Sequence, residues 1–221
     1  MGFLLVFFAV PVVLGLVTQS WVKNTFARAS KIQSASGMTG EDVCRALLNA
    51  GGLSGVGIER IGGELSDHYD PRAKVMRLSA AVGQSSSIGA IAVAAHETGH
   101  AFQDSKHEFS FRFRTALVPA VSFASQTWMF VLIIGAMTAS LQLTALSIAI
   151  FAAVVLFSLV TLPVEFGASR KAMRMLVAQG ILTPAEAPVA RKVLTAAAMT
   201  YVAAALAAVI QLAFLLLARR N

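Results

Sequence analysis

Residues 117–166 decide the fold, and they read "LVPAVSFASQTWMFVLIIGAMTASLQLTALSIAIFAAVVLFSLVTLPVEF". The stretch holds two apolar runs, Leu117 to Ala139 and Leu143 to Phe166, which are joined only by "SLQ". A helix of about 20 apolar residues crosses a hydrocarbon core about 30 Å thick. Both runs are long enough, and their short connection predicts a tight hairpin of two transmembrane helices.

Two further apolar runs lie outward from this hairpin, Gly2 to Trp21 and Ala196 to Ala218. The first run has no positive n-region and no small-x-small cleavage site, so we interpret it as an anchor and not as a signal peptide. The chain is 57% hydrophobic and only 13% charged, whereas a soluble domain has about 25% charged residues. The sequence therefore predicts a mostly α membrane protein with four transmembrane helices.

Basic residues beside the runs predict the orientation. They gather in the segments after the first run and between the third and fourth, and the loop between the second and third has none. By the positive-inside rule the N-terminus lies outside the cell. Arg219 and Arg220 then fall outside, against the rule. The predicted order is transmembrane helix 1 (1–22), a cytoplasmic catalytic segment (23–116), the hairpin (117–166), a cytoplasmic loop or helix (167–195) and transmembrane helix 4 with the C-terminus (196–221).

The formal net charge of +7 has the same explanation. Basic residues next to membrane spans contact anionic lipid and set topology. We expect the lipid bilayer as a partner and no nucleic acid, because no module of basic and aromatic residues is visible.

The first cytoplasmic segment has an α+β pattern. "MTGEDVCRALLNAGG" predicts a short helix with Thr39 as N-cap, and its single cysteine, Cys44, is interpreted as a small buried residue. "VGIERI" and "KVMRLS" alternate like strands. The second of these is either an edge strand that pairs with an extended substrate or an interior strand. "SSSIGAIAVAAHETGHAFQDS" predicts a helix capped by one of the three serines.

This last helix carries "HETGH", His96 to His100. Positions i and i+4 share one helix face, so the two histidines can bind one metal ion. Glu97 is rotated by about 100° around the axis and can flank an open coordination position. This HExxH pattern is typical of zinc peptidases, in which the glutamate acts as general base for an activated water. It predicts His96 and His100 as metal ligands and Glu97 as the catalytic base, with one Zn²⁺ per chain.

A third ligand must come from elsewhere in the chain. Gln103 and Lys106 stand where a metzincin has glycine and histidine, which excludes that class. Asp104 and His107 are weak candidates by helix geometry. We favour Glu165, because an acid at the cytoplasmic end of an apolar run is costly unless it has a partner. The alternative is an interfacial acid paired with Arg170 or Lys171.

"DHYDP" offers two further candidates. His68 or Tyr69 would donate a hydrogen bond to the oxyanion that forms during acyl transfer, and they are therefore candidate catalytic residues. The alternative interpretation is an Asx turn in which Asp67 and Asp70 accept backbone hydrogen bonds.

Three segments, "LSDHYDPRAKVMRLS", "IAVAAHETGHAFQD" and "LPVEFGASRKA", resemble the YugP-like family of neutral zinc metallopeptidases, which are bacterial membrane proteins. The resemblance implies a membrane-embedded zinc peptidase with His96, His100 and Glu165 on the metal and Glu97 as base. The chain departs from the family pattern at Gly167, where Asp or Asn is expected. Asp104 or Ser169 then has to orient a ligand histidine.

The predicted function is a zinc metalloendopeptidase of the bacterial inner membrane. Its zincin-like catalytic segment faces the cytoplasm, its substrates are peptides or membrane proteins, and an oligomer or partner membrane proteins remain open. Two alternatives stand beside it. One is a membrane scaffold or assembly factor with a structural or vestigial metal site. The other is a site-2-type intramembrane protease, against which the short apolar stretch before His96 argues.

Overall fold

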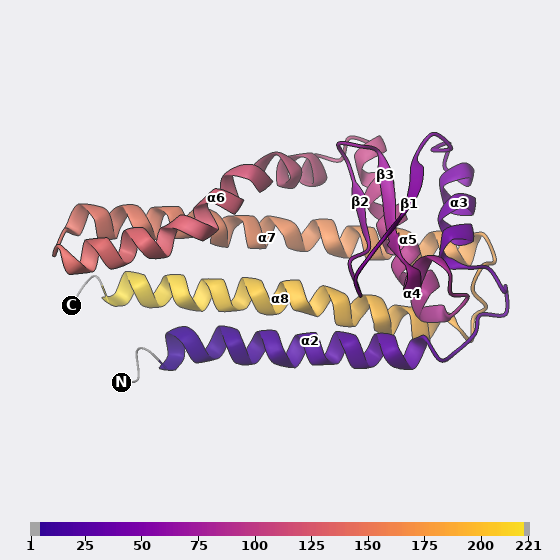
Figure 1. The fold of residues 1–221 in the computed structure, drawn as a ribbon, viewed down its shortest axis with the longest axis horizontal. Coiled ribbons are helices and arrows are strands. Elements are labelled where there is room, and N and C mark those ends of the chain that lie inside the picture. The colour runs from indigo at the N-terminus through magenta and orange to yellow at the C-terminus, as the bar shows by residue number, and fades with distance from the viewer. Residues whose placement is uncertain (1–4, 219–221) are drawn as a thin grey trace.

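The computed structural model describes residues 5–218 and is mostly helical, with a small sheet at one end of a bundle of long helices (Figure 1). The helices are η1 (Leu5–Ala9, a π-helix), α2 (Val10–Ala29), α3 (Gly40–Ala50), α4 (Ala80–Gly83), α5 (Ile88–Ser105), α6 (Phe109–Met137), α7 (Leu141–Ala178) and α8 (Ala187–Ala218). The strands are β1 (Gly57–Ile61), β2 (His68–Asp70) and β3 (Val75–Ser79).

Three helices of the described chain, α6, α7 and α8, are long and apolar enough to cross a membrane. They contain the second, third and fourth predicted spans. The first predicted span, Gly2 to Trp21, begins in residues 1–4, which lie outside the described part. Its remainder is divided between η1 and α2, and it is not among the three candidates. Helix α2 lies along α8 in the bundle (Figure 1).

The predicted hairpin is confirmed as a pair of packed helices, α6 and α7. Ser140 caps α7 by accepting a hydrogen bond from the backbone N–H of Leu143 at 3.3 Å. Near the other end of α6 stands Pro119, which lacks the N–H of an ordinary helical residue and bends a helix. Helix α6 accordingly lies beside α7 at the hairpin and leaves it on the way to the sheet (Figure 1).

The long helices do not end where the apolar runs end. A cytoplasmic segment was expected from Gly167 to Thr195, but α7 continues to Ala178 and α8 already begins at Ala187. The turn between them contains Gly180 at φ +65°, a conformation that favours glycine. The extension of α7 buries Ala168, Ala172 and Leu176. Packing in the head therefore stabilises the part of α7 that continues beyond its apolar run.

The end of the bundle that carries the sheet, called the head here, comprises α3, α4, α5, the sheet and the extensions of α2, α7 and α8. Helix α5 lies at its centre, where it packs against α3 and the sheet on one side and against α7 and α8 on the other. A shared core contains Leu47 of α3, Ile91 of α5, Leu176 of α7 and Leu194 of α8. The head and the membrane helices therefore share one fold and one set of long helices.

The sheet formed by the described residues has the order β1-β3-β2, with β3 parallel to β1 and antiparallel to β2. "KVMRLS" supplies β3, so the interior-strand reading of this segment is confirmed and the edge-strand reading is wrong. The segment "DHYDP", for which a turn was one of two interpretations, forms strand β2 from His68 to Asp70 before it turns. Because β2 is an edge strand, the backbone of Tyr69 is left free to contact α5.

The predicted helix starts in the head are confirmed. Thr39 accepts a hydrogen bond from the backbone N–H of Asp42, and the Asp42 side chain accepts one from the backbone N–H of Thr39, which is a complete capping box. Ser87, one of the three serines proposed, caps α5 through the backbone N–H of Ala90. Cys44 is buried as expected, and burial raises the pKa of its thiol to about 12.

Candidate metal centre

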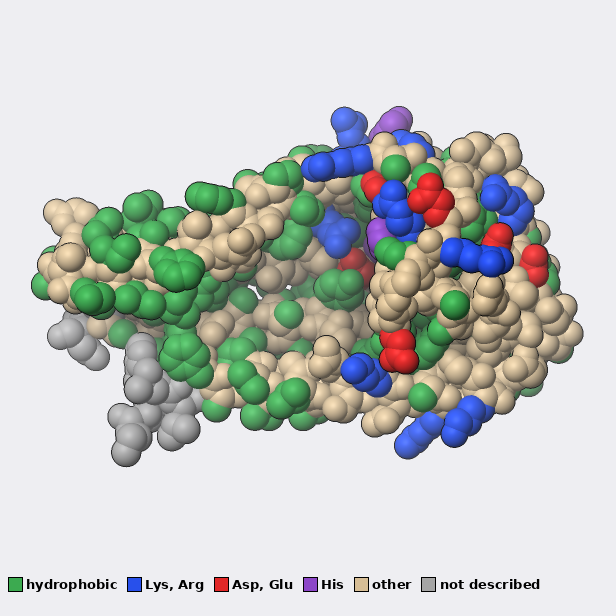
Figure 2. Space-filling view, in the orientation of Figure 1, with side chains coloured by type: hydrophobic (Ala, Val, Ile, Leu, Met, Phe, Trp, Pro, Cys, Tyr) green, Lys and Arg blue, Asp and Glu red, His purple; other side chains and the backbone are tan. Residues whose placement is uncertain are grey.

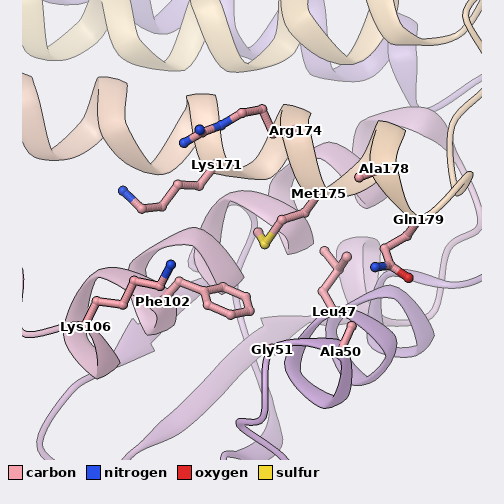
Figure 3. Close-up of a pocket in the computed structure, with 10 residues that line it drawn as sticks. All are labelled: Leu47, Ala50, Gly51, Phe102, Lys106, Lys171, Arg174, Met175, Ala178 and Gln179. Atoms are coloured by element: carbon pink, nitrogen blue, oxygen red, sulfur yellow. The ribbon is translucent and has the colours of Figure 1, made fainter.

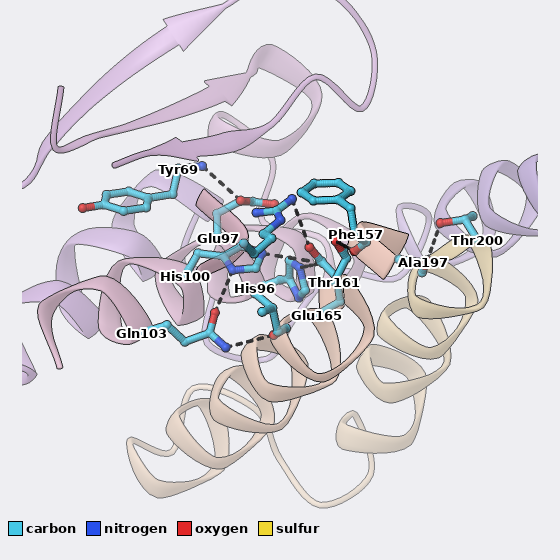
Figure 4. Close-up of polar contacts among 12 residues, drawn as sticks. Tyr69, His96, Glu97, His100, Gln103, Phe157, Thr161, Glu165, Ala197 and Thr200 are labelled. Carbon is cyan, nitrogen blue, oxygen red and sulfur yellow. Dashed lines mark hydrogen bonds and ion pairs between the residues drawn. The ribbon is translucent and has the colours of Figure 1, made fainter. Parts of the chain in front are cut away.

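Helices α5 and α7 bring two histidines and one glutamate together (Figure 4). The rings of His96 and His100 lie one turn apart on α5, with their centroids separated by 4.8 Å. Glu165 Oε2 lies 3.2 Å from His96 Nε2 and 3.6 Å from His100 Nε2. One donor atom from each of the three residues therefore lies within 4.8 Å of the other two. The carboxylate is only 2% exposed.

A glycine between the two histidines allows this approach. A Cβ atom at Gly99 would lie 2.7 Å from the backbone oxygen of Ala168, one turn along α7 from Glu165. No larger residue fits without moving one helix away from the other. The close contact between α5 and α7 thus depends on Gly99.

The outer nitrogen of each imidazole has its own partner. His96 Nδ1 lies 3.1 Å from Ser169 Oγ, and His100 Nδ1 lies 2.9 Å from Gln103 Oε1. An amide oxygen only accepts hydrogen bonds, so Gln103 requires a proton on His100 Nδ1 and leaves the Nε2 lone pair directed at Glu165. Two imidazole nitrogens turned inward beside a carboxylate match the usual donor set for zinc.

Gln103 also explains the departure at Gly167. Its Nε2 donates a hydrogen bond to the backbone oxygen of Val164 at 2.9 Å, which holds the amide against α7. A Cβ atom at Gly167 would lie 2.8 Å from the same Nε2. Glycine at this position therefore makes room for the glutamine that orients His100.

Glu97 lies beside the two histidines on α5 (Figure 4). Its Oε2 accepts a hydrogen bond at 3.1 Å from the backbone N–H of Tyr69 on the edge strand β2. Burial raises the pKa of the Glu97 carboxyl to about 7. A cavity of about 200 Å³ adjoins His96 and Glu97 and is walled by residues of α2, α8 and the β1–β2 loop. One oxygen of the Glu97 carboxylate is thus held by a hydrogen bond, and the side chain lies beside this cavity.

The side chains of His68 and Tyr69 are engaged away from the histidine cluster. The Tyr69 hydroxyl donates to Asp104 Oδ2 at 2.8 Å and points away from the histidines (Figure 4), and burial together with this bond raises its pKa. His68 Nδ1 lies 2.8 Å from the backbone oxygen of Ser66. What Tyr69 brings to the site is its backbone N–H, because alternation along β2 turns that group toward α5.

The Asx interpretation of "DHYDP" agrees with the contacts. Asp70 Oδ1 accepts hydrogen bonds from the backbone N–H groups of Arg72 and Ala73. Asp67 accepts one from the backbone N–H of Ser79 at 2.7 Å and so ties the segment to the end of β3.

The two weak ligand candidates near His100 stay outside the cluster. Asp104 accepts from Tyr69 and from Lys74 Nζ. His107 lies beyond the end of α5, at φ +51°. Arg170 and Lys171, the alternative partners of Glu165, point elsewhere: Arg170 Nε donates to the backbone oxygen of Phe166, and Lys171 pairs with Glu108.

Three residues of the site were missed at the sequence level: Gln103, Arg114 and Tyr201. Arg114 of α6 reaches to 3.6 Å from Glu165 Oε1. Tyr201 of α8 lines the cavity beside His96 and Glu97. The positive-inside rule already explained Arg114 as one of the basic residues beside a predicted span. No other feature of its sequence context indicated a role in the site. Gln103 carried a usable signal, a polar residue three positions after His100 on the same helix face.

A second pocket, of about 380 Å³, lies between α3, α5 and α7 (Figure 3). Phe102, Leu47 and Met175 form its apolar part, and Lys106, Lys171 and Arg174 are its basic residues. None of the three clustered donors lines it. Of these two pockets, the one beside His96 and Glu97 is the one that a clustered donor lines.

Known proteins support this assignment. The family model described as "Putative neutral zinc metallopeptidase" matches residues 4–220. A protein of Bacillus subtilis (strain 168) named "Putative membrane protease YugP" is 43% identical over 191 residues, which are 86% of this chain and 85% of that protein. No solved structure matches. On the family match over nearly the whole chain and this relative, the chain belongs to the neutral zinc metallopeptidase family, as the three sequence segments indicated.

Proposed function

We propose that this chain is a zinc-dependent endopeptidase that hydrolyses peptide bonds of membrane proteins or peptides at the cytoplasmic face of a bacterial plasma membrane. In this proposal the chain has four transmembrane helices, and its N-terminus lies outside the cell. The observation that carries the proposal is the convergence of His96, His100 and Glu165, with their donor atoms within 4.8 Å of one another. Glu97 stands next to them with one oxygen already held by Tyr69 N–H.

The donor set fits zinc, because Ser169 and Gln103 hold the outer nitrogens and both Nε2 atoms face Glu165. When bound, zinc would polarise a peptide carbonyl and lower the pKa of water. Glu97 would take a proton from the attacking water at Oε1, since Oε2 accepts the Tyr69 N–H. The water oxygen bonds to the carbonyl carbon, the C–N bond breaks, and Glu97 delivers the proton to the leaving nitrogen. The products are a carboxylic acid and an amine, which become a carboxylate and an ammonium group when the second proton of the water passes to the amine.

The location of the site supports a substrate that arrives from the membrane. Glu165 directly follows the apolar run of α7, and the cavity beside His96 includes apolar residues of α2 and α8. The surface is also hollowed between α6 and α8 beside the head, where charged and histidine side chains lie between apolar helices (Figure 2). Such a site is accessible to a segment that leaves the bilayer.

The activity test begins with metal content. We expect purified protein to carry about one zinc per chain, as a single site with three protein ligands requires. His96→Ala should lose most of the zinc. Glu97→Gln should keep it and lose hydrolysis, because an amide cannot accept the proton. Peptidase activity undiminished in Glu97→Gln would rule out the base assignment.

The orientation is tested by thiol labelling in intact cells. A cysteine placed at Ser105 should resist a membrane-impermeant reagent, and one placed at Ser140 should react. The native Cys44 gives little background, because it is buried and its pKa of about 12 keeps it protonated at neutral pH. The opposite labelling pattern would reverse the proposed topology.

The alternative functions lose support from particular residues. A scaffold with a vestigial site was favoured only by Gly167, and that residue now accommodates Gln103. A site-2-type protease would carry its HExxH motif within a span, and α5 is not among the candidate spans of the described chain.

A further inference from the structure

Arg114 lies in the second turn of α6, and one of its terminal nitrogens lies 3.6 Å from Glu165 Oε1. We propose that Arg114 binds the carbonyl oxygen of the substrate and stabilises the negative charge that develops there during attack. This inference rests on the peptidase function proposed above and adds to it a residue that contacts the reacting group.

The first support is that the guanidinium of Arg114 has no committed hydrogen bond. Its Nε is buried and has no partner among the described residues. Its nearest charged neighbour is Glu165 Oε1, at 3.6 Å from a terminal nitrogen, which is beyond hydrogen-bonding distance. A buried donor without a partner is destabilising. An oxygen of a bound substrate would satisfy this donor.

The second support is the geometry of the pair with Glu165. An arginine that serves only as an ion-pair partner normally binds a carboxylate with two parallel N–H···O bonds of about 2.7–2.9 Å. Here the distance is 3.6 Å and Nε faces no acceptor. The charge of Glu165 keeps the guanidinium close, while its N–H groups stay available for a ligand.

The third support is electrostatic. Neutral imidazoles and one carboxylate around a divalent ion leave a net positive site. A guanidinium placed there favours a transition state with an oxyanion more than it favours a neutral peptide group. The side chain is 26% exposed, so a substrate can reach it.

The fourth support is that the earlier candidates for this role are occupied. The Tyr69 hydroxyl is bonded to Asp104, and His68 Nδ1 faces the Ser66 carbonyl. Tyr201 of α8 lines the cavity beside His96 and Glu97, and its hydroxyl faces Glu165. Arg114 carries a permanent positive charge, which Tyr201 does not.

The test uses full-length, zinc-loaded protein in detergent and two synthetic peptides of the same apolar sequence. One is a phosphinic peptide, whose tetrahedral anion mimics the intermediate, and the other is a neutral hydroxamate. Binding is measured by calorimetry and zinc by elemental analysis, so both readouts are independent of turnover. The variants are Arg114→Gln and Arg114→Lys. The matched control is Arg112→Gln, which removes an exposed charge two residues away on the same helix.

We expect Arg114→Gln to keep its zinc and to weaken binding of the phosphinic peptide by about 10²–10³-fold, the effect of losing one oxyanion donor. Hydroxamate affinity should change by less than about threefold, and kcat should fall while KM stays similar. Arg114→Lys should be intermediate, because it keeps the charge and loses the planar fork. Arg112→Gln should behave like the wild type.

The inference is overturned if Arg114→Gln loses zinc in parallel, which would make Arg114 a support for Glu165 alone. It is also overturned if both peptides weaken equally, if neither weakens, or if the wild-type protein binds no phosphinic peptide. If that binding depends on Arg114 but no peptide is cleaved, the proposed peptidase function fails, and the catalytic part of the inference fails with it; only an anion-binding role for Arg114 is left. If Arg114→Gln cleaves peptide as fast as the wild type, the function stands and the inference fails.

Discussion

The two halves of α7 pack in opposite ways. The membrane half exposes large apolar side chains such as Leu141, which is 73% exposed, and packs against α6 and α8. The head half buries Val164, Glu165 and Ala168 against α5. Its contact residues are small, and Gly99 faces Ala168 at the closest point. The buried carboxylate is tolerated in this half, because nearby polar groups partner it there.

The comparison teaches how one helix serves two environments. Large apolar side chains suit a surface that faces lipid, because the lipid itself covers them and no contact with another helix is needed. Small residues let two backbones approach, so that short polar side chains from both helices meet. The metal-binding geometry is therefore a property of the α5–α7 contact and not of the HExxH motif alone.

The largest expected effect comes from removing the buried carboxylate. Glu165→Gln should strip zinc about as fully as His100→Ala, by several orders of magnitude in affinity, since both remove a ligand. Asp104→Asn should cost at most about 10–100-fold, the scale of a residue outside the ligand set, and His107→Ala should be nearly neutral. Zinc content and competition with a chelator measure all four. If Glu165→Gln binds zinc as tightly as the wild type, Glu165 is not a ligand and the proposed contrast between the two halves of α7 is wrong.

The next largest effect tests the close approach itself. Gly99→Ala places a Cβ atom 2.7 Å from the Ala168 carbonyl, so α5 must move away from α7. Overpacking of this kind costs about 1–3 kcal/mol, and we expect a lower Tm together with weaker zinc binding. Gly15→Ala, in α2, meets no atom within 4 Å and should not lower the Tm. Equal Tm values for the two variants would show that the contact between α5 and α7 accommodates the added methyl group without loss of stability.

The smallest expected effect concerns the pair Gln103 and Gly167. Gln103→Ala should weaken zinc binding by about 10–100-fold, because His100 loses the group that orients it. Gly167→Ala should weaken zinc binding in the wild type by pushing the amide away. It should add nothing in the Gln103→Ala background, where no amide remains to be displaced. A double-mutant cycle on zinc affinity measures this coupling, and additive effects would contradict it.

Much of the fold was predictable because its signals are local. The hairpin of α6 and α7, the capping box at Thr39 and the start of α5 at Ser87 all follow from residues close together in the sequence. The extension of α7 to Ala178 was not predictable, because the end of an apolar run marks the end of lipid contact and not the end of a helix. The central place of β3 in the sheet depends on pairing with distant segments, which periodicity does not reveal.

The same division applies to the site. His96, Glu97 and His100 were evident from their spacing, and Glu165 from an acid at the edge of an apolar run. The contact between the Tyr69 backbone and Glu97 was not predictable, because a sequence shows the hydroxyl of a tyrosine and does not show a free backbone N–H on an edge strand. The contact of Arg114 with Glu165 was not predictable for a different reason, because the positive-inside rule already explained the charge of this residue.

The continuity of α7 has a mechanical consequence. Its 38 residues form one rod of about 57 Å, and Glu165 lies about 36 Å from the Leu141 end. That distance exceeds a hydrocarbon core of about 30 Å, so α7 is long enough to cross a bilayer and to carry Glu165 beyond its hydrocarbon core. Helix α5 is not among the candidate spans of the described chain, so a tilt of α7 relative to α5 would move Glu165 against the two histidines. A change of lipid chain length that tilts α7 would then alter the spacing of the three clustered donors.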